Sequence, residues 1–436
     1  IVANDKEIQR IGKTKKEKST RYVKWEREKT GSYPYVVPGE LIGKPLEGEY
    51  RRVMDNLFDT YTELSEPYLD YTKQRYPKGE GESDRAFRIS RGAKRFDDLR
   101  DILPFGTKTS LAFLANGRAN ENLINRMMAS DVGESQWWAQ QIYRVLQQEV
   151  PSFVKRVGSE RGEQLPKYRM RQRDFKRATQ PFVPESTALE KDNVLYEGKW
   201  AELLEITPEA DIKILSRYYQ RGSGRSIRDL QRYFRSTSKE DRVGQLKEIL
   251  SLRFVDRSSP NRESDRFNKP PRAFESIMLY FALKCRAGDY RDLQRHRMMS
   301  HDRDLFTTRL NYDVDEDLKD SPFYPRVQSV FAEVSTLYES IRREISPEVA
   351  QYCVPMAFIQ NWYANIPARE LYWIAELRTS PQARPHYKEV VLEMADAALH
   401  VAPELFWAMQ VNREQHRISR REETIRAEKK RAALAA

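Results

Sequence analysis

The sequence contains little cysteine and histidine, and it has no long apolar run. Its 436 residues include two cysteines and five histidines. No Cys/His spacing typical of a metal site occurs, and no phosphate loop of the G-x-x-x-x-G-K kind. No apolar run approaches the roughly 18 residues that a membrane-spanning helix needs. With Cys285 and Cys353 as the only possible pair, we expect a reducing, cytoplasmic protein without a metal.

Positive charge is in excess. The chain has 76 Lys+Arg against 65 Asp+Glu, a net charge of +11. Such a charge attracts polyanions in general and does not choose between nucleotide, nucleic acid and a solvated basic surface. Much of the excess lies near the ends, in Lys13–Lys18 and Arg417–Arg431. A basic helical nucleic-acid-binding protein is therefore one interpretation, although no nucleic-acid motif supports it.

Apolar periodicity predicts a helix-rich chain of two or three domains. Trp137, Trp138, Ile142, Val145 and Leu146 are expected to form the buried face of one helix. Polar residues 156–190 indicate a linker, residues 194–206 favour strands, 107–115 fit a short strand or a buried helix, and 274–285 form a strong apolar element. The expected helices are 48–76, 84–102, 120–155, 208–219, 226–234, 239–253, 324–346, 347–363 and 384–411.

Two segments repeat the same order of features. In the first, Arg100-x₃-Pro104 is followed by an apolar run, Asn116-Gly117-Arg118 and a helix that ends at Pro151. In the second, Tyr363-x₃-Pro367 is followed by an apolar run, Glu376-Leu377-Arg378 and a helix that ends at Pro403. We therefore predict an internal duplication. The chain opens with Ile1, so we expect the first repeat to be truncated at its N-terminus.

The densest group of chemically active side chains is Gln294-Arg295-His296-Arg297, followed by Thr307-Thr308-Arg309. Arginine binds phosphate and carboxylate through a rigid fork of donors and keeps its charge at physiological pH. The cluster indicates an anion site, with phosphate as the expected anion. A solvated basic helix face is the alternative.

This motif resembles the signature of flavin-dependent thymidylate synthases (ThyX-like proteins), in which RHR is followed by a hydroxyl-x-Arg. Ser19-Thr20-Arg21-Tyr22 looks like the end of the same signature in the first repeat. Arg100-x₃-Pro104, Asn116-x-Arg118 and Asn122 resemble the family's later motifs. Pro271–Glu275 stands where the family has a His-rich stretch, with Glu275 as the possible survivor.

The resemblance implies methylation of dUMP to dTMP. Methylenetetrahydrofolate would supply the carbon, reduced FAD the hydride, and NADPH the electrons that reduce the flavin. Arg295 would be the catalytic cation, stabilising negative charge on the pyrimidine carbonyl. The residues that the resemblance assigns to the substrate dUMP are Gln294, Arg295, Thr307, Thr308, Arg309, Ser19, Arg21 and Arg100. Those assigned to the flavin are His296, Arg297, Asn116, Arg118, Asn122 and Glu275.

The sequence also departs from the family pattern. The His-rich stretch is missing, and His301–Asp304 replaces the usual Asn-Glu. A non-catalytic paralogue that binds nucleotide or flavin is therefore the main alternative.

For the fold, the resemblance implies an α+β protein of two tandem ThyX-like units, residues 1–190 and 191–436. Each unit would be a small antiparallel sheet packed with long helices. We expect a homo-oligomer, a dimer of two-repeat chains, in which the second repeat's RHR and the first repeat's Arg100, Asn116 and Arg118 form a composite site.

Overall fold

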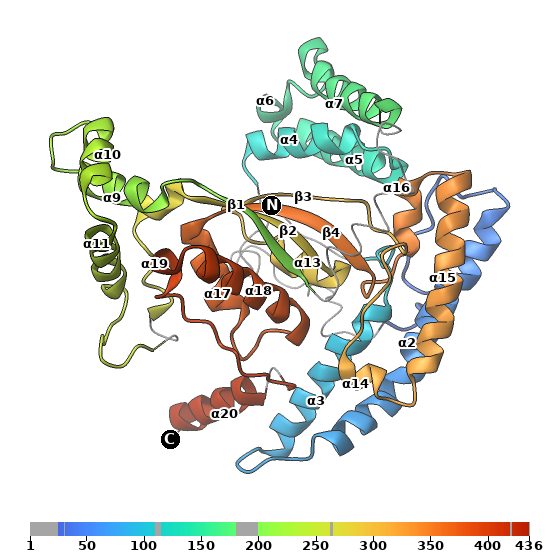
Figure 1. The fold of residues 1–436 in the computed structure, drawn as a ribbon. Coiled ribbons are helices and arrows are strands. Elements are labelled where there is room, and N and C mark those ends of the chain that lie inside the picture. The colour runs from blue at the N-terminus through green and yellow to red at the C-terminus, as the bar shows by residue number, and fades with distance from the viewer. Residues whose placement is uncertain are drawn as a thin grey trace.

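The structure is a computed structural model that describes residues 25–29, 31–109, 115–179, 199–261, 265–418 and 421–435. It is a helix-rich α+β fold, and its described part has one four-stranded antiparallel sheet. In the view of Figure 1, the strands cross the middle of the molecule and long helices lie on both sides of them. The expected α+β class is therefore confirmed.

In the first half of the chain, residues 25–179 of the described part, the regular elements are helices. Its elements are α2 (Leu46–Arg75), α3 (Asp84–Leu99), the 3-10 turn η1 (Arg100–Ile102), α4 (Gly117–Met128), α5 (Gly133–Glu149), α6 (Pro151–Val154) and α7 (Glu160–Thr179). The second sheet that we expected in this half is not found among the described residues. The apolar run proposed as its strand falls mainly on residues 110–114, outside the described part.

The second half supplies all four strands and the remaining helices. The strands are β1 (Ala201–Ile206), β2 (Met278–Arg286), β3 (Ser300–Arg303) and β4 (Ile359–Pro367). The helices up to β3 are α9 (Ala210–Gln220), α10 (Ile227–Ser236), α11 (Lys239–Ser251), η3 (Arg272–Ser276) and α13 (Ala287–Leu293). Those after β3 are α14 (Glu316–Lys319), α15 (Tyr324–Glu344), α16 (Pro347–Ala350), η4 (Gln351–Cys353), α17 (Ala368–Arg378), α18 (Pro385–Val401), α19 (Pro403–Phe406) and α20 (Arg421–Ala435).

The sheet has the strand order β1-β2-β4-β3. β2 and β4 pair along their whole length, with Phe281 opposite Ala364. The short edge strand β3 pairs with β4, and β1 pairs with β2 through a bulge near Leu203. Alternate residues of β2 and β4, such as Leu279 and Trp362, are buried, because successive side chains of a strand point to opposite faces. α18 packs against β1 and β2 on the buried face.

Two long helices, α2 and α15, pack against each other beside the sheet. In α2, Tyr50, Val53, Leu57 and Tyr61 recur every three or four residues and are at most 1% exposed. This spacing places them on one face of the helix. They join the large apolar core that also contains the buried side of the sheet.

Elements of the two halves recur at a nearly constant spacing. η1 and η4 begin 251 residues apart, as do α4 and α17. α5 and α18 begin 252 residues apart and have 17 residues each. α6 and α19 also begin 252 residues apart, and each starts with proline. Below, the counterpart of a residue in the other half is the residue 251 positions away, up to α4 and α17, and 252 positions away from the residues before α5 and α18 onward.

The two halves also meet through matched backbone hydrogen bonds. Phe105 donates to Val354 (3.0 Å), and the counterpart of Phe105, Met356, donates to Leu103 (3.1 Å). One step outward, Gly106 donates to Tyr352 (2.8 Å) and Ala357 donates to Asp101 (2.9 Å). Between them Pro104 and Pro355 form an antiparallel bridge. The pattern has the form of a local two-fold arrangement about these two prolines.

This spacing corrects our alignment of the two segments. It pairs Arg100 with Gln351 rather than with Tyr363, and Arg118 with Arg369 rather than with Arg378. The tandem-unit boundary at residue 190 lies outside the described part of the chain.

Three local expectations were wrong. Residues 347–363 are mostly not helical, because they contain η4 and the first half of the central strand β4. Residues 160–179, expected in a linker, form α7. Trp137, Trp138 and Val145 are 52%, 47% and 57% exposed, so the face expected to be buried on α5 is largely open.

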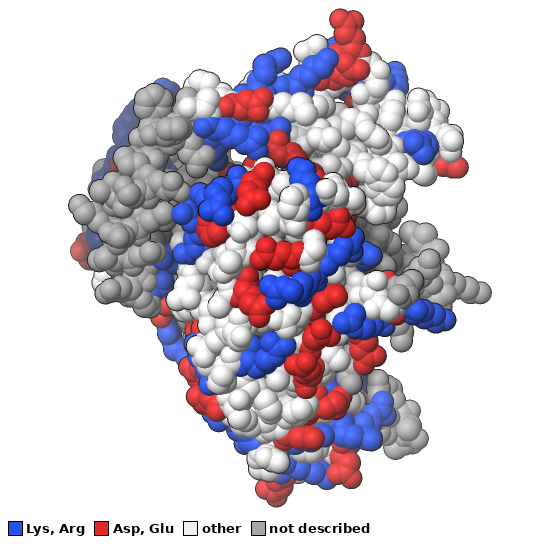
Figure 2. Space-filling view, turned by 90° about the vertical axis from the view of Figure 1, so that its right-hand side faces the viewer, with Lys and Arg blue, Asp and Glu red and all other residues white. Residues whose placement is uncertain are grey.

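The surface shows mixed charge. On the face drawn in Figure 2, Lys and Arg are interspersed with Asp and Glu and do not gather into one basic patch. Among the residues that the structure describes, no helix is both long enough and apolar enough to cross a membrane.

Candidate functional site

The Gln294–Arg297 cluster lies directly after α13, where the chain leaves the core and turns toward β3. Gln294 caps the helix and is exposed, as are Arg295 and Arg297. His296 between them is 5% exposed. The turn therefore places two guanidinium groups at the surface and one imidazole in the interior.

His296 is held by two residues of α17. Glu370 Oε1 lies 3.2 Å from its Nδ1, and the Arg378 Nε–H donates to its Nε2 at 2.9 Å. An arginine donates and does not accept, so Nε2 must be unprotonated and the ring proton lies on Nδ1. The Nδ1–H then donates to the Glu370 carboxylate. Arg378 also donates to the Asp292 carbonyl (2.6 Å), which ties α17 to the end of α13.

Burial keeps His296 neutral. Desolvation is the largest cause that lowers the pKa of His296 below its usual value, and the positive charge of Arg378 lowers it further. The hydrogen bond that His296 donates to Glu370 raises the pKa and is a smaller effect than burial. The imidazole thus serves as a fixed neutral group beneath the two exposed arginines.

Glu275 reaches the same helix from η3. Its carboxylate lies 3.2 Å from Arg369 Nη1 and 3.2 Å from Arg272 Nη2. Arg369 and Glu370 are adjacent at the start of α17, so the helix connects Glu275 on one side with His296 on the other. Sequence reasoning had not identified Arg369 and Glu370. They are the second and third residues of the helix that follows β4, a strand that ends in proline, and this position was the available signal.

Arg100 from the first half joins the cluster through Asp292. One oxygen of Asp292 lies 3.4 Å from Arg100 Nη2, and the other lies 3.5 Å from Arg295 Nη1. Arg100 is 4% exposed, and burial is the main cause that lowers its pKa. Arg100 and Arg295 thus share one carboxylate within a single chain, and the expected composite site stays a prediction.

A buried ionic network lies beneath this junction. Arg384 pairs with Asp101 (3.1 Å) and Asp289 (3.1 Å), and Arg286 pairs with Asp101 (2.9 Å) and Asp313 (2.5 Å). Four of these five side chains are 2% exposed or less, and Asp313 is 17% exposed. The network joins η1 of the first half to the strand and helices that carry the Gln294–Arg297 cluster.

Thr307, Thr308 and Arg309 lie elsewhere. β3 separates them from the cluster and runs antiparallel to β4, away from the start of α17. Arg309 pairs with Glu339 of α15 (3.2 Å), and the Thr307 hydroxyl accepts from the Arg309 backbone (3.1 Å). The structure therefore does not bring the two parts of the sequence motif together within one chain, and their shared role stays a prediction.

Asn116, Arg118 and Asn122 lie exposed on α4. Asn116 caps this helix by accepting from the Ala119 backbone at 2.9 Å, which gives it a structural role. α4 packs mainly with α5, α6 and α7. Ser19 and Arg21 fall outside the described residues.

A buried acidic cluster is already occupied by a lysine. Asp98, Asp315 and Asp317 converge as metal ligands can, but the Lys94 ammonium lies 2.9, 3.2 and 2.7 Å from them. Burial, with the charge of Asp315, raises the pKa of Asp98 to about 8. The cluster is a buried ion-pair network between the two halves of the chain.

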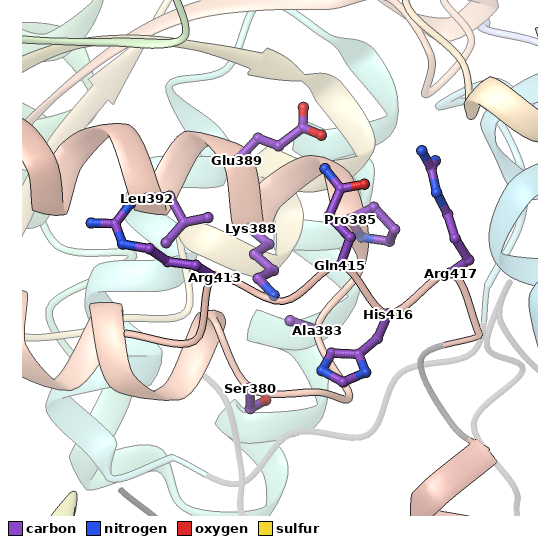
Figure 3. Close-up of a pocket in the computed structure, with 10 residues that line it drawn as sticks. All are labelled: Ser380, Ala383, Pro385, Lys388, Glu389, Leu392, Arg413, Gln415, His416 and Arg417. Carbon is purple, nitrogen blue, oxygen red and sulfur yellow. The ribbon is translucent and has the colours of Figure 1, made fainter. Parts of the chain in front are cut away.

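A small cavity lies between α18 and residues 413–417 (Figure 3). Lys388, Glu389, Arg413 and Arg417 line it. Arg413 and Arg417 are paired with Asp396 and Glu316, so their charges are largely compensated. None of the residues that the sequence singled out lines this cavity.

The α13–α17 junction, and not the cavity, carries the Gln294–Arg297 cluster. Exposed arginine forks at Arg295 and Arg297 suit phosphate groups. Buried anchors below them, Glu370 and Asp292, fix the surrounding turn. The chemistry of these residues is thus compatible with FAD, whose phosphates need cations and whose ring system needs hydrogen-bonding partners.

Comparison with known proteins identifies the class. A family model described as "thymidylate synthase complementing protein" (Thy1) matches residues 8–152 and 231–404, which is more than half of the chain. The chain belongs to this family, and the resemblance read from the Gln294–Arg309 motif is confirmed.

Among curated proteins, the chain is similar to two chlamydial and one archaeal relative that carry only a family label. A UPF0159 protein of Chlamydia muridarum is 31% identical over 407 residues, 92% of this chain and 73% of that protein. One from Chlamydia pneumoniae is 30% identical over 409 residues, 93% of this chain and 74% of that protein. One from Thermoplasma acidophilum is 25% identical over 424 residues, 91% of this chain and 79% of that protein.

Among solved structures, a UMP/dUMP methylase PolB from Streptomyces cacaoi, bound with 5-Br dUMP, shows a partial likeness. The TM-score is 0.34 and the sequence identity 17%, over 48% of this chain and 93% of that one. At this level the likeness adds nothing to the assignment of the site.

Proposed function

We propose that the protein is a flavin-dependent thymidylate synthase that methylates dUMP to dTMP. The observation that carries this proposal is the α13–α17 junction, where His296 is fixed by Glu370 and Arg378 beneath the exposed Arg295 and Arg297. Family membership supports the same reaction. When bound, FAD supplies the hydride, methylenetetrahydrofolate the carbon, and NADPH the reducing electrons.

The residues of the chain bind, orient and stabilise charge. Arg295 is suited to the phosphate of dUMP or to negative charge that develops on the pyrimidine. Arg297 is suited to a flavin phosphate. His296 cannot act as an acid at neutral pH, because burial keeps it neutral and Arg378 occupies its Nε2. We assign it a positioning role through the turn that carries both arginines.

The separation of Thr307–Arg309 from this junction supports a site that two copies of the chain complete together. In this arrangement the hydroxyl groups and Arg309 of one copy would face the arginines of the other. The internal two-fold arrangement about Pro104 and Pro355 supports the tandem origin that we infer, with one unit in each half. The same arrangement supports a dimer of two-unit chains.

The experiment is a binding and turnover assay on the purified chain. FAD should bind and colour the protein yellow, and incubation with dUMP, methylenetetrahydrofolate and NADPH should yield dTMP. Arg295→Ala should lower turnover by about 100-fold, as expected for loss of one charge-stabilising group. Arg235→Ala is the matched control, because Arg235 is an exposed arginine on α10 that pairs with Glu209.

The outcomes separate the two readings of the site. A chain that binds FAD and dUMP but makes no dTMP would instead be the non-catalytic paralogue. The departures at residues 271–275 and 301–304 favour this second candidate. A chain that binds neither ligand would contradict both.

A further inference from the structure

The α9–α10 hairpin consists of α9, α10 and the short loop that joins them, and the two helices pack against each other. In the view of Figure 1 the hairpin lies at the left edge of the molecule, on the side opposite α2 and α15 and away from the face drawn in Figure 2. The family model matches residues 8–152 and 231–404, so α9, the loop and the first part of α10 lie outside both matched regions. Family membership therefore does not explain what this hairpin does.

Positive charge dominates the tip of the hairpin. Residues 212–228 contain five basic side chains and no acidic one. Four of these are exposed arginines at the end of α9, in the loop and in the first turn of α10, namely Arg217, Arg221, Arg225 and Arg228. Among the described residues none of the four forms an ion pair, whereas Arg232 and Arg235, farther along α10, pair with Asp229 and Glu209. The tip therefore carries positive charge that the chain does not compensate.

Two exposed tyrosine rings accompany these arginines. Tyr219 of α9 is 41% exposed and Tyr233 of α10 is 61% exposed. Both rings contact Phe234, which is 3% exposed: Tyr219 stacks on it with the ring centroids 5.8 Å apart, and Tyr233 meets it edge-on at 5.1 Å. One buried ring thus holds an exposed ring of each helix in place at the surface. In the chain, Tyr219 also lies between Arg217 and Arg221.

This combination fits a polyanion that also presents flat rings. Arginine forks bind phosphate oxygens, and nucleic-acid bases stack on aromatic side chains. In a duplex the bases are stacked on one another and closed to such rings, so the hairpin suits a single strand. An anionic lipid surface would satisfy the arginines but would offer no ring to Tyr219 and Tyr233. Unstacked bases of loops and ends are the usual targets of RNA-binding proteins.

We infer that the tip of the α9–α10 hairpin binds single-stranded RNA. Arg217, Arg221, Arg225 and Arg228 contact the phosphates, and Tyr219 and Tyr233 provide stacking surfaces for bases. Phosphate contacts and stacking carry little sequence information, so binding tolerates changes of sequence. The site is separate from the α13–α17 junction, and the inference does not rest on the proposed function.

The test is fluorescence anisotropy of a labelled RNA strand of about 12 uridines, titrated with the full chain. Four phosphate contacts predict that affinity falls by about 50-fold between about 50 mM and about 200 mM salt, because each contact on a single strand contributes about 0.7 to the logarithmic slope. Absence of binding at the lower salt concentration would overturn the inference.

Competition identifies the class of partner. An RNA duplex of the same length and phosphatidylserine vesicles should each displace the labelled strand at least about ten-fold more weakly than unlabelled single-stranded RNA does. Single-stranded DNA of the same length should compete no better than the RNA. A duplex, vesicle or DNA strand that competes better than the RNA would overturn the assignment to single-stranded RNA.

A charge-matched pair of variants separates the hairpin from the overall charge of the chain. One variant changes the four hairpin arginines together to glutamine and should weaken RNA binding by more than about 30-fold and remove most of its salt dependence. The control also changes four exposed arginines to glutamine, Arg85 and Arg88 on α3, Arg144 on α5 and Arg343 on α15, and should stay within about two-fold. Equal losses in both variants would contradict a site on the hairpin.

The stacking role has its own readout. Tyr233→Leu should weaken RNA binding by about 10-fold, the loss of one stacking contact, without changing the salt dependence. Tyr233→Phe keeps the ring and should bind within about two-fold of the unaltered chain. Tyr168→Leu is the matched control, because Tyr168 is 50% exposed on α7. Equal affinities for Tyr233→Leu and Tyr168→Leu would contradict the stacking role.

Discussion

The helices α4–α6 and α17–α19 have nearly equal lengths and equal spacing, but different surroundings. Val390 of α18 is 1% exposed, whereas its counterpart on α5, Trp138, is 47% exposed. Leu405 of α19 is 0% exposed, whereas its counterpart, Phe153, is 63% exposed. α18 packs against β1 and β2.

The first set of helices instead has only a small apolar cluster of its own, formed by Ile124, Ala139, Val154 and Val157. The difference shows that the order of helices and breaks recurs, whereas among the described residues only the second set is buried by a sheet. The difference also affects the proposed site, because α17 and α4 carry different residues at matching positions. The two residues of α17 that hold His296, Glu370 and Arg378, have Ala119 and Met127 as counterparts on α4. Neither can make the same contacts.

The largest expected effect is on stability. Arg384→Met should lower the free energy of unfolding by about 3–5 kcal/mol, because it leaves the buried carboxylate of Asp289 without its arginine and removes one of the two arginines that pair with Asp101. The counterpart of Arg384 is Val132, and Val132→Met should cost less than about 1 kcal/mol. Urea unfolding of both variants measures the difference. Equal losses of unfolding free energy in the two variants would contradict the asymmetry between the halves.

The next effect is on activity. Arg378→Ala should lower dTMP formation by about 100-fold, because His296 and the end of α13 lose their anchor. Met127→Ala, at the counterpart position of α4, should stay within about two-fold. The measurement is the turnover rate of each variant relative to that of the unaltered chain. Similar losses in both variants would mean that α4 takes part in the site as directly as α17 does.

A smaller effect concerns packing. Val390→Ser should destabilise the chain by about 2 kcal/mol, since it removes a buried apolar group and introduces a hydroxyl. Trp138→Ser should cost less than about 1 kcal/mol, because the tryptophan is half-exposed. The midpoint of thermal unfolding reports both changes. A larger loss for Trp138→Ser would show that another surface buries the α5 face.

The smallest effect is pH dependence. The pKa values of His296 and His386 are lowered by burial, so the unfolded state gains protons first as pH falls below about 6.5. Stability from these groups is present above that pH and decreases below it. All five histidines lie in the second half. Hydrogen exchange at pH 7.5 and 5.5, corrected for intrinsic rates, should show acid-induced loosening of α17 and α18 but not of α4 and α5. His296→Gln should reduce the acid-induced loosening of α17, because the variant lacks this titrating group.

The sequence located candidate residues better than it predicted their geometry, and the roles of those residues stay predictions. The Gln294–Arg297 cluster could be recognised as a rare local pattern of charged residues, and Glu275 through its place in the family resemblance. Arg369 and Glu370 could not be recognised in this way, because they lie on the helix that follows β4. The sequence had predicted a helix over 347–363, where the first half of β4 lies. β4 contains Asn361 and Asn365, which are poor strand formers, and its pairing with β2 and β3 stabilises it.

Burial on α5 was not predictable for a related reason. Trp137, Trp138, Ile142 and Leu146 follow a helical period, and such a period identifies an apolar face without stating what covers it. In α18 the same kind of face meets β1 and β2, whereas in α5 Trp137 and Trp138 remain about half exposed. Periodicity therefore predicted helical structure here, but the single helix expected over residues 120–155 is divided into α4, α5 and α6, and the environment of the apolar face was predicted wrongly.

The central claim is that one half of the chain carries the flavin and nucleotide site. The most direct test is the number of FAD molecules bound per chain at saturation, measured by absorbance on protein freed of unbound flavin in the presence of dUMP. We predict one FAD per chain, because only α17 supplies the residues that hold His296. Two FAD molecules per chain, or none, would contradict this claim.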